Sequence, residues 1–74
     1  MNPKPTTEEA RIDLNDIRNE LEAMRRILAD ATWLSMRNDV DAPFYAGVVR
    51  KVTGHIDSGS GVERSILKNY PELL

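Results

Sequence analysis

The sequence predicts an all-α protein, in which a long N-terminal helix forms a helical hairpin with a second helix, followed by a short third helix. Three observations favour this fold. Hydrophobic residues recur at alternating steps of three and four, glycines and prolines are grouped, and the 74 residues include no cysteine. Because so short a chain buries little apolar surface and has no disulfide to brace it, we expect dimerisation through the long helix.

The long helix is predicted for residues 7–37, where no glycine or proline interrupts the pattern. Thr6 is a favourable N-cap, and Glu9 three residues later completes the spacing of a capping box. The preceding residues 1–6 contain two prolines, and we expect them to form a disordered tail. The helix is therefore expected to have a defined start.

The second and third helices are predicted on either side of a glycine-rich break. "RNDVDAP" at 37–43 is typical of a turn, after which apolar residues recur at helical spacing over 42–56. Gly47 inside that helix suggests a close helix contact, because glycine there costs about 1 kcal/mol relative to alanine. "DSGSG" at 57–61 is predicted to be a flexible connection, followed by a helix at about 61–70 that a proline ends.

The apolar stripe of the long helix is the predicted dimer seam. It consists of Leu14, Ile17, Leu21, Met24 and Leu28. Asp13 and Glu20 flank it on one side, and Arg18 and Arg25 flank it on the other. In a parallel coiled coil these residues pair Asp13 with Arg18 and Glu20 with Arg25 of the second chain, whereas an antiparallel pair groups like charges. The pattern thus favours a parallel homodimer.

Two other assemblies stay open at this stage. A higher oligomer is compatible with leucine at each first core position of the heptad. A monomeric three-helix bundle would pack the same stripe against the second and third helices. The second helix, at about half the length of the first, and the short third helix count against the monomer.

Composition excludes several classes of partner. Twelve acidic and ten basic residues give a net charge of −2, which provides no electrostatic footprint for nucleic acid or an anionic membrane. The first residues, "MNPKPTTEE", contain no apolar signal region, and no apolar run has the length of a membrane span. We therefore expect a cytoplasmic protein.

No motif predicts catalysis, a metal site or a cofactor. His55 is the only histidine, and its neighbours Asp57 and Ser58 are more typical of a solvated helix end than of a catalytic group. "SGSG" lacks the lysine of a phosphate-binding loop. The acidic residues lack the Glu-x-x-His spacing of carboxylate metal sites in helical bundles. We expect a protein that is not an enzyme.

A cluster at the corner between the first two helices is the candidate partner site. It consists of Trp33, Met36, Phe44 and Tyr45. Aromatic residues and methionine are enriched where proteins bind one another. A small acidic helical dimer with such a surface suits a regulator, inhibitor or adaptor, such as an antitoxin or a phage-encoded modulator.

The alternative function is DNA binding. The second and third helices together suggest a helix-turn-helix, whose recognition helix would offer Arg64, Lys68 and Asn69 to the DNA. Acidic Glu63 at the start of that helix and the long glycine-rich connection argue against it. We therefore favour protein binding over DNA binding.

Overall fold

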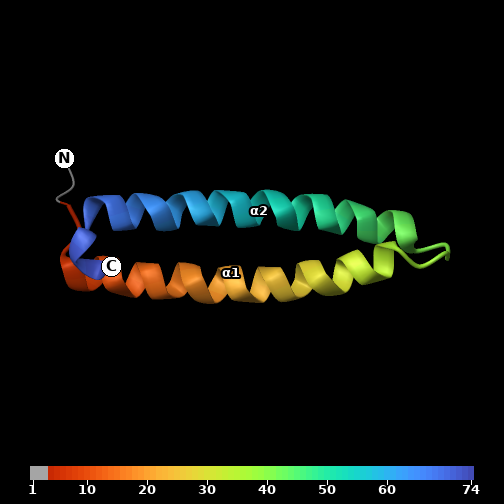
Figure 1. Cartoon of the computed structure of the whole chain (residues 1–74), viewed down its shortest axis with the longest axis horizontal. Helices are drawn as coiled ribbons and strands as arrows, with labels where there is room; N and C mark the ends of the chain where they lie inside the picture. Colours follow the sequence, from red (N-terminus) through yellow and green to blue (C-terminus); the bar gives the residue numbers. More distant parts are fainter. Residues whose placement is uncertain (1–3) are drawn as a thin grey trace.

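A computed structural model describes residues 4–74 and shows two long antiparallel helices packed side by side (Figure 1). Helix α1 spans Thr7–Ser35, helix α2 spans Ala42–Asn69, and a 3-10 turn, η1, spans Pro71–Leu73. The hairpin measures 51 × 24 × 15 Å. The loop between the helices lies at one end of this rod, and the start of α1 lies beside the end of α2 at the other. The all-α prediction is confirmed for the described residues.

Helix α1 begins as the sequence predicts. The Glu9 amide donates to Thr6 Oγ1 at 3.2 Å, and the Thr6 hydroxyl donates to Glu9 Oε1 at 3.1 Å. Glu8 also pairs with Arg11 at 3.3 Å, and both glutamates complement the positive end of the helix dipole. The helix ends at Ser35, two residues before the predicted boundary.

Helix α2 is continuous, so the prediction of two helices joined by a flexible connection at 57–61 is wrong. Gly59 supplies the physical reason. A Cβ atom built on Gly59 would lie 2.8 Å from Leu21 Cδ2, closer than real Cβ contacts. The glycine therefore lets Leu21 fit against α2, and this packing outweighs the poor helix propensity of the segment. At Gly47, where the sequence suggested a close contact, a Cβ would meet only Arg50 at 3.8 Å.

The two ends of α2 are set by local chemistry. In the preceding turn the amide of Asp41 donates to Asp39 Oδ1 at 3.0 Å, and the Asp41 side chain itself makes no capping bond. Pro43 lies in the first turn, where a missing N–H costs nothing. At the far end Tyr70 leaves helical geometry, and Pro71 begins the 3-10 turn as expected of a helix-ending proline.

The core is a single stripe between the two helices. Its fully buried members are Ala10, Leu14, Leu21, Ala31 and Tyr70. Leu21 is the most enclosed, at 1% exposure, and α2 contributes no fully buried residue between its ends. Within the described chain, no helix is long and apolar enough to cross a membrane.

Candidate functional site

The loop end of the hairpin exposes a group of large apolar side chains, which we name the tip surface. It consists of Trp33, Met36, Val40, Phe44 and Tyr45. The first four are 60%, 72%, 90% and 69% exposed, and Tyr45 is half-buried. The four residues predicted as a partner site therefore lie on the surface of the single chain rather than in its core. Val40 belongs to the same group, and sequence reasoning missed it.

Two aromatic contacts order the tip surface. The Arg37 guanidinium lies 5.3 Å from the centre of the Trp33 ring, a cation–π distance. Phe44 and Tyr45 meet edge to face, with ring centres 5.4 Å apart. Arg37 also pairs with Asp39 at 3.6 Å. The exposed rings are thus partly held in place before any partner binds.

The residues of the predicted dimer seam lie along the line where α1 meets α2 of the same chain. Leu14 and Leu21 are fully buried there, and Ile17, Met24 and Leu28 are half-buried. Arg18 donates to Glu63 Oε2 of its own chain at 2.7 Å, whereas the predicted parallel dimer uses it against another chain. Arg25 is exposed. A role for these residues between two chains stays a prediction.

One side of the hairpin carries a groove between the helices, with an apolar floor and an acidic rim. Its lining consists of Asp13, Asp16, Ile17, Glu20, Val62 and Ile66. Asp13 and Glu20, the two acidic residues of the predicted seam, therefore point to one side rather than into the core. Val62 in the floor is 46% exposed. This groove leaves apolar surface without cover in the single chain.

Comparison with protein-family models, with curated proteins and with solved structures finds no match for this chain. His55 is exposed within α2. Residues 4–74 contain no group of three or more histidine, cysteine or carboxylate side chains that could hold a metal ion. That the protein is not an enzyme stays a prediction.

The helix-turn-helix prediction is wrong, because its turn does not exist. Residues 57–61, which were expected to connect two helices, lie within α2. Arg64 and Lys68 therefore extend along the same rod as the rest of α2 and cannot form a separate recognition helix. Whether the protein binds DNA in another way stays a prediction.

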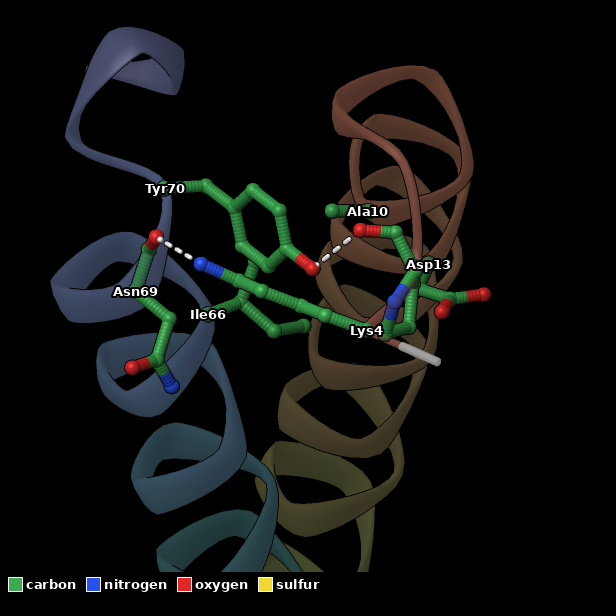
Figure 2. Close-up of a pocket in the computed structure, with 7 residues that line it drawn as sticks. Lys4, Ala10, Asp13, Ile66, Asn69 and Tyr70 are labelled. Carbon is green, nitrogen blue, oxygen red and sulfur yellow. Dashed lines mark hydrogen bonds between the residues drawn. The ribbon is translucent and has the colours of Figure 1, made fainter. Parts of the chain in front are cut away.

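The end of the hairpin opposite the tip is closed by a group of polar contacts, which we name the terminal clasp (Figure 2). Lys4 Nζ lies 4.5 Å from the centre of the Tyr70 ring and donates to the Asn69 carbonyl at 3.2 Å. The Tyr70 hydroxyl donates to the carbonyl of Pro5. Lys4 and Pro5 thus contact the end of α2. The disordered tail predicted for residues 1–6 stays a prediction, and residues 1–3 lie outside the described chain.

Glu72 joins the same clasp from η1. Its Oε1 accepts from the Thr7 hydroxyl at 2.8 Å. A backbone hydrogen bond and the Thr7 bond lower the pKa of Glu72 from its ordinary value of 4.5. Burial, with nearby carboxylates including Glu72, raises the pKa of Tyr70 above 10.0. The contacts of the clasp therefore favour a charged Glu72 beside a neutral Tyr70.

The clasp should weaken in acid. Because the folded pKa of Glu72 is lowered, its contribution to stability is complete above pH 4.5 and is lost as pH falls through the folded pKa. Replacing Thr7 with valine should move that pKa part of the way back toward 4.5, as followed by carboxyl carbon shifts in an NMR titration. The control Thr53→Val, which removes a hydroxyl on α2 rather than at the start of α1, should leave the pKa of Glu72 unchanged. An unaltered Glu72 pKa in Thr7→Val would disprove the contact.

Proposed function

We propose that this protein is a non-enzymatic interaction module that forms a homodimer and binds another protein through the tip surface. The observation that supports this most directly is the exposure of Trp33, Met36, Val40 and Phe44, each at 60% or more, at one end of the rod. Single exposed apolar residues are ordinary, but several large exposed apolar side chains near one end of a molecule are typical of binding sites. A regulator, inhibitor or adaptor is the class of function that this surface suits.

The chemistry of the tip surface fits a protein partner. Trp33, with Arg37 over its ring, combines the two residue types that most often dominate binding energy at protein interfaces. The paired rings of Phe44 and Tyr45 provide rigid apolar area with few rotatable bonds. Two copies of this surface on a homodimer would bind a multivalent partner with avidity.

The tip proposal can be tested by capturing partners from the cells that make the protein. Trp33→Ala should lose partners that the wild type retains, because a central aromatic anchor commonly contributes 2 kcal/mol or more, about a thirtyfold change in Kd. Ile12→Ala is the matched control, since Ile12 is 53% exposed on α1 but lies far from the tip. Equal capture by Trp33→Ala and the wild type would refute the proposal.

A further inference from the structure

The first turns of α2, next to the loop in Figure 1, carry a groove that we name the cationic groove. Its lining comes from α2 alone and consists of Pro43, Phe44, Gly47, Val48, Arg50 and Lys51. It shares no residue with the acidic groove between the helices. Because Phe44 also belongs to the tip surface, the cationic groove adjoins the partner site of the proposed function.

The cationic groove has an apolar part that stays open in the single chain. Phe44 is 69% exposed, and its ring rests edge to face against Tyr45. Gly47 lines the same groove, and a Cβ built there would meet only the Arg50 guanidinium at 3.8 Å. Packing within the chain therefore does not require a glycine here, and the missing side chain leaves a notch near an exposed ring. A notch of this kind can accept an apolar side chain of a partner.

The charged side chains that line the cationic groove are both basic. Arg50 and Lys51 are exposed, and the ion pairs formed within residues 4–74 involve other residues. The stretch of α2 from 42 to 56 contains no acidic residue in its sequence. The groove therefore combines two cations that have no counter-charge with an open apolar surface.

The carboxylates around the cationic groove do not line it. Asp41 precedes α2, and Asp57 lies six residues beyond the groove, about 9 Å farther along the helix. Asp39 pairs with Arg37 in the turn, and Asp30 lines a separate pocket of α1. The positive charge of the groove is therefore local, on a chain whose net charge is −2.

From these observations we infer that the cationic groove binds an acidic peptide segment of a partner protein. A large apolar side chain of the segment would fill the notch at Gly47, beside Phe44. Carboxylates on either side of that residue would pair with Arg50 and Lys51. Complementary charges of this kind direct the encounter and select the partner. This inference deepens the proposed function and rests on it, because it names the chemistry of the partner.

An acidic peptide fits the cationic groove better than other polyanions do. Nucleic acids and anionic membranes bind through many cations at once, whereas this groove offers two. A phosphate backbone also provides no apolar group for the notch beside Phe44. A peptide can supply the carboxylates and the apolar side chain together.

The first test selects random peptides, displayed on phage, against the whole wild-type chain. The selected peptides should be enriched in aspartate and glutamate on either side of an aromatic or large aliphatic residue. The dissociation constant of a selected peptide should rise at least about tenfold in the charge-reversal variant Arg50→Glu/Lys51→Glu, because two attractions become repulsions. Fluorescence anisotropy of the labelled peptide measures the constant, and circular dichroism checks that the variant is helical.

The matched control for the charge reversal is Arg64→Glu/Lys68→Glu. It makes the same change in net charge on exposed residues of the same helix. Arg64 lies about 20 Å from Lys51 along α2, beyond the reach of most screened charge effects. The dissociation constant of the selected peptide should stay the same in this control.

The second test separates binding from stability by means of two glycines. Gly47→Ala introduces no clash, so its melting temperature should rise, but its methyl group would fill the notch and raise the dissociation constant of the peptide at least about fivefold. Gly54→Ala is the matched control, because a Cβ there has nothing within 4 Å and Gly54 does not line the groove. It should raise the melting temperature equally and leave peptide binding unchanged.

Four results would overturn the inference: no peptide selected, selected peptides without acidic residues, an affinity that the charge reversal does not change, or equal binding by Gly47→Ala and Gly54→Ala. Labelled duplex DNA or anionic lipid vesicles that bind where acidic peptides do not would also overturn it. So would a wild-type oligomer that the charge reversal dissociates, because the groove would then hold a second copy.

The inference and the proposed function can fail separately. Cellular partners that are lost in Trp33→Ala but retained by Arg50→Glu/Lys51→Glu would refute this inference alone. Equal capture by Trp33→Ala and the wild type, with acidic peptides bound at the cationic groove, would refute the role of Trp33 alone.

Discussion

Replacing Leu21 with lysine is expected to unfold the hairpin. Leu21 is 1% exposed and packs directly against Gly59 of α2. A buried and unpaired ammonium group costs several kcal/mol, and a 74-residue chain has only roughly 4 to 11 kcal/mol of stability in total. Circular dichroism at 25 °C should therefore show loss of most of the helical signal, because helices of this kind depend on tertiary packing.

The matched control for Leu21→Lys is Ile12→Lys. Both substitutions place a lysine on α1, but Ile12 is 53% exposed, so its side chain can stay in water. The control should retain the helical signal and a cooperative melting transition. If Leu21→Lys melts like the control, then α1 does not bury its stripe against α2 and the fold described above is wrong.

Replacing glycines of α2 with alanine should give the second large effect. The change in the free energy of unfolding should be positive at some of these positions and negative at another. Nothing lies within 4 Å of a Cβ atom built on Gly54 or Gly61, so alanine at either position should stabilise the helix by about 1 kcal/mol. Alanine at Gly59 would place its Cβ 2.8 Å from Leu21 Cδ2. Overpacking of this kind costs about 1–3 kcal/mol, so the net effect should be destabilising.

A double-mutant cycle isolates the contact between Leu21 and Gly59. In a Leu21→Ala background the crowded methyl groups are gone, so Gly59→Ala should become stabilising by about 1 kcal/mol. Urea unfolding of the four proteins measures the coupling, provided that Leu21→Ala is still folded; stabilising osmolyte can be added equally to all four. If Gly59→Ala stabilises both backgrounds, the two helices do not approach closely at this point.

Much of the fold could be predicted from local sequence. The alternation of three- and four-residue steps identifies α1, and Thr6 with Glu9 marks its start. The break at 57–61 was predicted because glycine and serine favour flexible segments when only local propensity is considered. In the structure these residues are helical instead, and Gly59 packs against Leu21, 38 positions away along the chain. No local sequence pattern reveals that contact.

The candidate site was predicted in part. Aromatic residues gathered around a turn identified the tip, but only the structure shows that Trp33 and Phe44 are exposed. The terminal clasp gave no sequence signal, because Lys4 and Tyr70 meet only after the chain folds back on itself. Likewise, the sequence does not reveal that Asp13 and Glu20 of α1 line one groove together with Ile66 of α2.

These findings change the role of the apolar stripe on α1. A stripe of this kind can pack against a helix of a second copy or against a helix of the same chain, and the spacing of its residues does not distinguish the two. Here α2 covers it, and Leu14 and Leu21 become the core of a hairpin. The large apolar side chains that stay exposed include Trp33, Met36, Val40 and Phe44 of the tip surface.

The most direct test of this account is the contact between the Leu21 methyl groups and the α-protons of Gly59, measured as a nuclear Overhauser effect. The hairpin predicts a strong cross-peak, because a Cβ on Gly59 would lie 2.8 Å from Leu21 Cδ2. The peak should persist when labelled protein is diluted into an excess of unlabelled protein, since the contact lies within one chain. A missing peak, with random-coil chemical shifts for residues 57–61, would contradict the account.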